Sequence, residues 1–126
     1  MTTLPPGGWI AVDLDGTLAH YDGWRGPHHI GPPIADMATR VRRWLEEGRD
    51  VRIFTARVAD GPLAVAEVEA WSLLHLGRRL VVTNVKDRFM IELWDDRAVQ
   101  VVRNTGVPIS AALLHLASMV APHPDH

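Results

Sequence analysis

The chain has 126 residues, a formal net charge of −2 and 22% charged residues, values that are ordinary for a single globular domain. It contains no cysteine, which excludes disulfides, thiolate metal sites and cysteine nucleophiles and favours a reducing, cytoplasmic location. The nearly balanced charge provides no footprint for tight nonspecific binding to nucleic acid. The longest mostly apolar stretch near the C-terminus, 111–121, is too short to span a bilayer, so we expect no membrane partner.

The first predicted element is a buried strand. Residues 9–12 form a continuous apolar run that leads into the acidic sequence 13–18. The segment 19–33 is rich in glycine, proline and histidine, and we predict that it is a loop or hairpin lying as a flap over the end of this strand. An amphipathic helix is predicted to begin at about Ile34 and to end at Gly48, because apolar residues recur between them at helical spacing.

The rest of the chain continues to alternate between strands and helices. The further predicted elements are strands at 50–55, 80–83 and 90–94, a loop at 56–62, a helix at about 63–76, a short strand or helical turn at 99–102, and a terminal helix at 109–120. This alternation predicts an α/β fold: a doubly wound, Rossmann-like parallel sheet with helices on both faces. We expect one domain over 1–126 with a flexible tail at about 121–126, and no repeat or linker.

Polar residues that could take part in catalysis or ligand binding follow the predicted strands. Asp13 and Asp15 come after the first strand, Thr55 closes the second, and the pair 95–96 closes the last. In open parallel sheets the carboxyl ends of the strands are where ligands bind. Lys86, which follows the third strand, is the only lysine, against twelve arginines. The first cluster taken alone would equally fit a strand that stops at a solvated Asp-Gly turn, and it fits a calcium loop poorly.

In this order, Asp13-Leu14-Asp15-Gly16-Thr17-Leu18, Thr55, Lys86 and Asp95-Asp96 resemble the four motifs of the haloacid dehalogenase-like hydrolase superfamily. The resemblance extends from Trp9 to about Asn104. It implies a Mg²⁺-dependent phosphomonoester hydrolase that forms an aspartyl-phosphate, with a nucleotide or other small phosphate ester as substrate. Two alternatives remain open. One is a polynucleotide-end (3′) phosphatase, to which Asp95-Asp96-Arg97 bears a weaker likeness; the other is a catalytically idle phosphate-binding or regulatory domain.

The resemblance also implies a role for each motif residue. Asp13 would attack phosphorus, and Asp15 would protonate the leaving oxygen and then activate water. Thr55 and Lys86 would complete the catalytic set by holding the phosphate and offsetting its charge. The implied phosphate-binding residues are Leu14, Thr55, Ala56 and Lys86, and we add Arg57 and Arg97 as substrate-binding candidates because they lie close to the motif residues in the sequence.

Magnesium is the implied cofactor, because an anionic carboxylate must approach an anionic phosphate. Two unit charges 4 Å apart repel by about 4 kcal/mol at an effective dielectric constant of about 20. The resemblance implies as ligands of the ion Asp13, the backbone carbonyl of Asp15 and one of Asp95 and Asp96, completed by phosphate and water; of the pair we favour Asp96. Asp95 would then orient Lys86 or a metal-bound water.

The gaps between the motifs are too short to hold a folded cap domain. We therefore expect a capless enzyme with an open site, which suits nucleic-acid ends or phosphoproteins and also admits small nucleotides. An oligomer is not predicted, although a partner subunit could cover such a site. Flap residues that could contact substrate, but that would equally be ordinary solvated or anchoring residues, are His20, Tyr21, Trp24, Arg25, His28 and His29. Trp44 and Trp71 lie on helix faces and are predicted to be core residues.

Overall fold

The computed structural model describes residues 7–120, so the predicted tail at 121–126 lies outside the described residues. The chain forms two compact units, one extending to Asp96 and one beginning at Arg97, and each is described by itself. The prediction of one domain over the whole chain stays a prediction.

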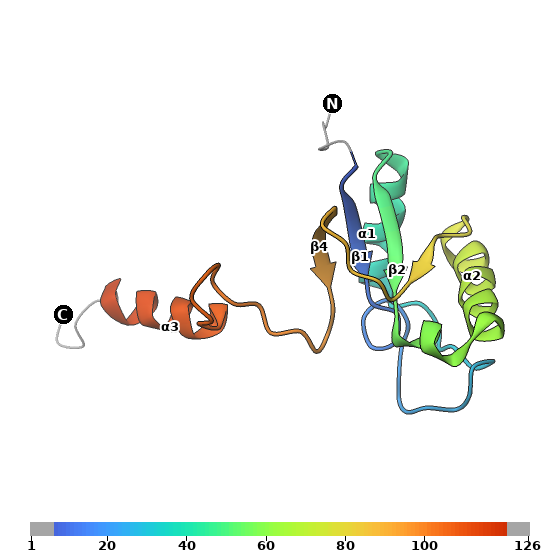
Figure 1. Ribbon diagram of the computed structural model, residues 1–126, viewed down its shortest axis with the longest axis horizontal. Helices are drawn as coiled ribbons and strands as arrows, with labels where there is room; N and C mark the ends of the chain where they lie inside the picture. Colours follow the sequence, from blue (N-terminus) through green and yellow to red (C-terminus); the bar gives the residue numbers. More distant parts are fainter. Residues whose placement is uncertain (1–6, 121–126) are drawn as a thin grey trace. The chain divides into compact units, whose positions relative to one another are not determined.

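The first unit contains a four-stranded sheet whose strands are all parallel. The strands are β1 (Trp9–Val12), β2 (Asp50–Phe54), β3 (Val82–Thr83) and β4 (Met90–Trp94), in the order β3-β2-β1-β4 (Figure 1). All four residues of β1 are buried, which agrees with its apolar run and its place between two neighbours. The predicted α/β class and parallel sheet are confirmed. Strand β3 is shorter than the predicted 80–83, since only two of these residues pair with β2.

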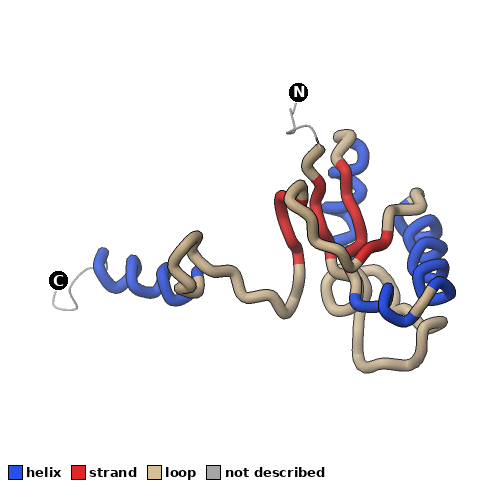
Figure 2. The backbone as a smooth tube through the Cα atoms, viewed as in Figure 1, coloured by secondary structure: helices blue, strands red, loops and turns tan. Residues whose placement is uncertain are grey.

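Two α-helices connect the strands of this unit (Figure 2). Helix α1 spans Ala35–Glu46, and helix α2 spans Pro62–Leu76. Proline suits the first turn of α2 because its missing N–H would have no partner there, and Gly77 ends the helix in the left-handed conformation at φ 80°. A short 3₁₀ helix, η1 (Ala56–Asp60), occupies most of the segment that we predicted as a loop at 56–62.

The core lies between the helices and one face of the sheet. Five buried residues of α1 and three of α2 join Ile10, Val12, Val51 and Ile53 in one apolar cluster, and Trp44 and Trp71 belong to it as predicted. The opposite face of the sheet is crossed by the β3–β4 connection, whose Asp87 accepts a hydrogen bond from Trp9 Nε1 at 2.9 Å. Within residues 7–96 the two α-helices thus pack on one face, and a doubly wound arrangement stays a prediction.

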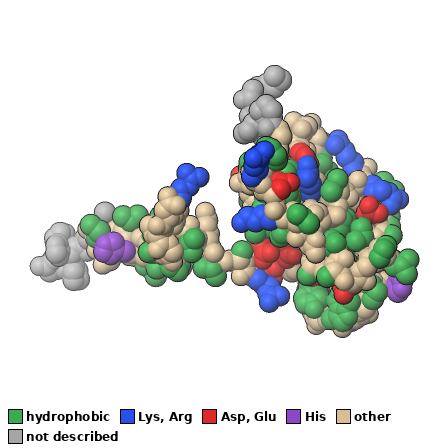
Figure 3. Space-filling view, viewed as in Figure 1, with side chains coloured by type: hydrophobic (Ala, Val, Ile, Leu, Met, Phe, Trp, Pro, Cys, Tyr) green, Lys and Arg blue, Asp and Glu red, His purple; other side chains and the backbone are tan. Residues whose placement is uncertain are grey.

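The second unit contains helix α3 (Ile109–Val120), as predicted. Residues 99–102 form neither a regular strand nor a helical turn; a single bridge joins Val101 to Pro108. Apolar side chains, drawn green in Figure 3, are exposed along α3 at Leu113, Leu114, Leu116 and Met119. Across the described residues, no helix combines the length and apolar character that crossing a membrane would need.

Candidate active site

The loop after β1 presents the first acidic cluster at the carboxyl edge of the sheet. The backbone N–H of Asp13 donates to the carbonyl of Trp94 at 2.9 Å, which extends the β1–β4 pairing by one residue. The chain then winds tightly, because the carbonyl of Leu14 accepts from the N–H groups of Thr17, Leu18 and Ala19. The Leu14 side chain is fully buried and anchors this turn to the core. Asp13 and Asp15 are thereby held at the same edge of the sheet.

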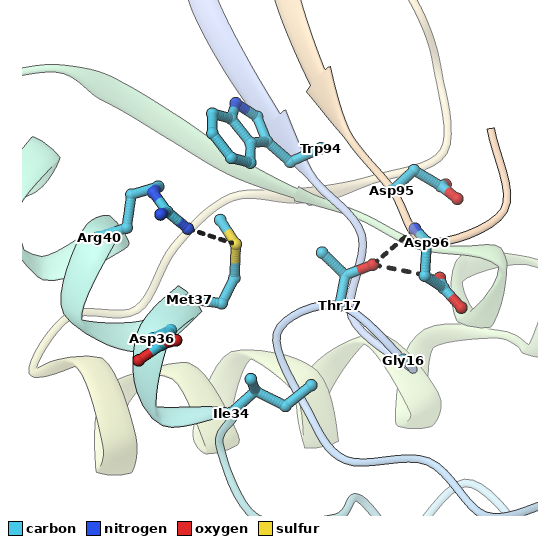
Figure 4. A pocket seen from close by; sticks show the side chains of 9 residues that line it. All are labelled: Gly16, Thr17, Ile34, Asp36, Met37, Arg40, Trp94, Asp95 and Asp96. Carbon is cyan, nitrogen blue, oxygen red and sulfur yellow. Dashed lines mark hydrogen bonds between the residues drawn. The ribbon is translucent and has the colours of Figure 1, made fainter. Parts of the chain in front are cut away.

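Three carboxylates converge at this edge. One oxygen each from Asp13, Asp95 and Asp96 lies within 4.8 Å of the others, which is close enough to surround a single cation. Thr17 fixes one member of the group: its hydroxyl donates to Asp96 Oδ1 at 3.1 Å and accepts from the Asp96 backbone N–H at 2.9 Å (Figure 4). These residues come from opposite ends of the first unit's sequence, and the pairing of β1 with β4 brings them together.

The surroundings of Asp13 oppose its negative charge. Burial, a side-chain hydrogen bond with Asp96 and the charges of Asp95 and Asp96 raise the pKa of Asp13 from 3.8 to about 7, although a backbone hydrogen bond from Leu14 acts in the other direction. A bound cation would reverse this balance, because it favours the ionised form of every carboxylate around it. The charge arrangement therefore fits a cation held by oxygen ligands.

Gly16 is required by the close approach of this loop to Asp96. A Cβ atom at position 16 would lie 2.5 Å from Asp96 Oδ2, and the residue has φ of 89°, in the region that favours glycine. The absence of a side chain thus leaves room for the Asp96 carboxylate beside the loop. This is a structural reason for the Asp-Gly pair beyond the turn that we inferred from the sequence.

Asp15 lies in a different environment from Asp13, although only one residue separates them. Its two carboxylate oxygens accept hydrogen bonds from Nε and Nη2 of Arg57, at 2.8 and 2.9 Å. Sequence reasoning placed Arg57 near the site as a substrate ligand but did not pair it with Asp15. The predicted use of the Asp15 carbonyl as a metal ligand is not tested by these contacts.

The other predicted site residues are placed as follows. Thr55 is 3% exposed at the end of β2, and its hydroxyl accepts from the backbone N–H of Arg57 at 3.1 Å, so it caps η1. Ala56 is the first residue of η1 and is exposed. Lys86 is exposed in the β3–β4 connection and makes no hydrogen bond or ion pair within the described part of the chain. Arg97 begins the second unit, so its place relative to the site stays a prediction.

An open hollow of about 320 Å³ adjoins the carboxylate cluster. Its lining residues, drawn in Figure 4, are Gly16, Thr17, Ile34, Asp36, Met37, Arg40, Trp94, Asp95 and Asp96. The Arg40 guanidinium lies over the Trp94 ring, 4.9 Å from its centroid. Sequence reasoning missed Met37, Arg40 and Trp94 as parts of the site; the position of Trp94 directly before the acidic pair was the one signal that pointed to it.

Side chains of the flap make ion pairs within the flap and with α2. Arg25 pairs with Asp22 at 2.9 Å within the flap, and His28 Nδ1 lies 3.0 Å from Glu67 Oε1 on α2. Tyr21 and Trp24 are about half exposed. Their predicted contacts with substrate stay predictions.

Comparison with known proteins adds no relative: no family model, no curated protein and no solved structure matches this chain. The likeness to the haloacid dehalogenase-like hydrolases therefore rests on the motif residues, and the case for function rests on the site itself.

Proposed function

We propose that this chain is a Mg²⁺-dependent phosphomonoester hydrolase with Asp13 as its nucleophile. The observation that carries the proposal is the convergence of Asp13, Asp95 and Asp96 on one point at the carboxyl edge of the sheet. Three like charges so close together repel one another, and a divalent cation would relieve this repulsion. Carboxylate oxygens are the ligands that Mg²⁺ prefers.

The residues of the site would divide the work of hydrolysis. The Asp13 carboxylate would attack phosphorus as the ester oxygen leaves, and water would then cleave the resulting aspartyl-phosphate. Asp15 would give a proton to the leaving oxygen and take one from the water. While it carries that proton, it would keep only one of its two hydrogen bonds from Arg57. The cation, held by Asp13 and Asp96 with Asp95 nearby, would supply positive charge for the phosphoryl oxygens.

Thr55 and Lys86 would act on the phosphate rather than on the metal. The Thr55 hydroxyl already accepts a hydrogen bond, and its own hydrogen can be donated to a phosphate oxygen. Lys86 offers three donors from an exposed position and would reach the phosphate from the β3–β4 connection. The substrate we favour is a nucleotide or another small phosphate ester. Within residues 7–96 no cap domain is inserted between the strands, and such a site admits polynucleotide ends as the alternative.

The direct test is phosphate release from a panel of esters. An aryl phosphate, mononucleotides and oligonucleotides ending in 3′-phosphate would be incubated with the full chain, with Mg²⁺ and with excess EDTA. We expect turnover of at least one ester that requires Mg²⁺. Preference for the oligonucleotides would favour the polynucleotide-end alternative, and binding of phosphate without any turnover would favour the idle domain.

Two variants assign the nucleophile. Asp13→Asn should lower turnover at least about a thousandfold, because the amide cannot form the acyl phosphate. Asp60→Asn is the matched control: it removes an exposed carboxylate in η1, remote from the three-carboxylate cluster in sequence, and should keep normal turnover. Appreciable activity of the Asp13 variant would refute the assignment.

A further inference from the structure

A buried arginine links the flap to Asp15. Arg57 lies in η1, directly after β2, and its side chain is only 4% exposed. The hydrogen bond from its backbone N–H to the Thr55 hydroxyl fixes the start of η1 and thereby the direction in which the Arg57 side chain leaves the backbone. A buried guanidinium needs partners for its charge and its donors, and Arg57 has them on two sides.

On one side, Arg57 holds the carboxylate of Asp15. The two hydrogen bonds, at 2.8 and 2.9 Å, run in parallel from Nε and Nη2 to the two carboxylate oxygens. This bidentate geometry fixes the plane of the carboxylate as well as its distance. Asp15 is the group that would exchange protons with the substrate, so its orientation bears directly on the proposed reaction.

On the other side, Arg57 holds the flap. Nη2 donates to the carbonyl of His29 at 2.9 Å, Nη1 donates to the carbonyl of Pro27 at 3.4 Å, and the guanidinium lies 4.8 Å from the centroid of the Trp24 ring. Two other side chains join the flap to α2 by hydrogen bonds: Glu67 contacts His28, and Trp71 Nε1 donates to the carbonyl of Gly31 at 3.0 Å. The Glu67 bond to His28 is exposed, so the buried contacts of Arg57 and Trp71 are the stronger anchors.

These contacts leave Arg57 little capacity for substrate. Its side chain has five N–H groups, and the four hydrogen bonds to Asp15, Pro27 and His29 use four of them. We propose that Arg57 is a positioning residue that couples the flap to the general acid-base group, so that the order of the flap and the orientation of Asp15 change together. The effect on catalysis rests on the proposed function; the coupling between flap and carboxylate does not.

The coupling can be measured without activity, by amide hydrogen exchange in peptides covering residues 20–31. Arg57→Met should accelerate exchange there at least about tenfold, the change expected when a hydrogen bond to a charged group is lost. Asp15→Asn should accelerate the same peptides, although Asp15 makes no side-chain hydrogen bond to the flap, because Arg57 loses its anionic partner. Unchanged flap exchange in Asp15→Asn would overturn the coupling.

Control variants distinguish the effect of losing the buried Arg57 contacts from the effect of losing an exposed charge. Glu67→Gln breaks the exposed anchor of the same flap and should change exchange less than about fivefold. Arg79→Met removes an exposed arginine that pairs loosely with Glu69, at 3.8 Å, and should change nothing in the flap. If Arg57→Met does not fold, Arg57→Lys serves in its place. Lysine keeps the charge but lacks the planar fork, so flap exchange should still rise, and wild-type exchange would overturn the proposal.

Steady-state kinetics of the Arg57 variants distinguish a positioning role from substrate binding. With the best ester from the panel, Arg57→Met or Arg57→Lys should lower kcat at least about tenfold and leave KM within about twofold. A large rise in KM with unchanged kcat would mean that Arg57 binds the substrate, and would overturn its positioning role. If the wild-type chain hydrolyses no ester, the proposed function fails, and the exchange experiment still decides whether Arg57 couples the flap to Asp15.

Discussion

Asp13 and Asp15 are both aspartates and lie two positions apart in one loop, but the charged groups around them have opposite signs. Asp13 faces two further carboxylates, and its pKa is raised to about 7. Asp15 faces a buried arginine that binds both of its oxygens. The difference shows that an acidic pair in a sequence can divide into a group surrounded by like charges and a group paired with a cationic side chain.

The largest loss of stability should come from breaking the ion pair between Asp15 and Arg57. Asp15→Asn leaves the buried Arg57 without an anionic partner, and we expect the free energy of unfolding to fall by about 2–3 kcal/mol at pH 8 without metal, somewhat less than for a fully buried pair because Asp15 is 21% exposed. Urea denaturation would measure it. Asp22→Asn, which breaks the exposed pair with Arg25, should cost less than about 1 kcal/mol. Equal losses in the two variants would contradict the contrast.

The second predicted loss of stability comes from filling the space that Gly16, in the loop after β1, leaves for the Asp96 carboxylate. Gly16→Ala places a Cβ atom against the Asp96 carboxylate at a positive φ, and we expect a loss of stability of about 2 kcal/mol together with a weaker response to Mg²⁺. Gly48→Ala is the matched control, since Gly48 has φ of 79° with open space around it. It should share the backbone penalty, about 1 kcal/mol, and keep the full response to Mg²⁺. Thermal unfolding with and without Mg²⁺ distinguishes the two variants.

The carboxylates around Asp13 predict an unusual pH dependence of the free energy of unfolding. Because the pKa of Asp13 is raised in the folded state, the folded chain binds more protons than the unfolded chain between about pH 4 and pH 7. The free energy of unfolding of the metal-free protein should therefore fall as the pH rises from 5 to 8, by about 1.5 kcal/mol after allowance for the partial exposure of the carboxyl group. Asp13→Asn should flatten this slope and should be more stable than the wild type at pH 8. A wild-type stability that rises over this range would refute the assignment of the shift.

The smallest predicted effect is the stabilisation of the folded protein by Mg²⁺, which tests whether Asp13 and its neighbouring carboxylates bind a cation. At ten times its dissociation constant, Mg²⁺ should stabilise the wild type by about 1.4 kcal/mol, and the gain should be larger at pH 8 than at pH 5 because binding requires ionised carboxylates. Asp96→Asn should lose most of this gain, whereas Asp60→Asn should keep it. Stabilisation that survives in the Asp96 variant would place the cation elsewhere.

Much of the fold could be predicted from local patterns. The apolar run 9–12, the amphipathic spacing up to Gly48 and the glycine at 77 led to β1, α1 and the end of α2. The errors occurred where local patterns are weak. Strand β3 is an edge strand that pairs through two residues, and the segment 99–102 pairs only through the single bridge of Val101 with Pro108, too little to form a strand.

The candidate site was only partly visible in the sequence. The motif residues identified Asp13, Asp95 and Asp96, and the structure brings these three together. The partner of Asp15 was not visible, because Arg57 is separated from it by 42 residues and could equally have pointed to solvent or to substrate. The Trp94–Arg40 contact beside the cluster was missed for the same reason.

By itself, the sequence determined the alternation of strands and helices, and with it the placement of the acidic residues at strand ends, because periodicity and turn residues act over a few positions. The tertiary structure decided which charges meet. Strand order places Asp95 and Asp96 beside Asp13, and the contact of η1 with the flap and the loop after β1 gives Asp15 its arginine. Electrostatic interactions depend on distance in space and on burial, and neither quantity is recorded in the order of residues along the chain.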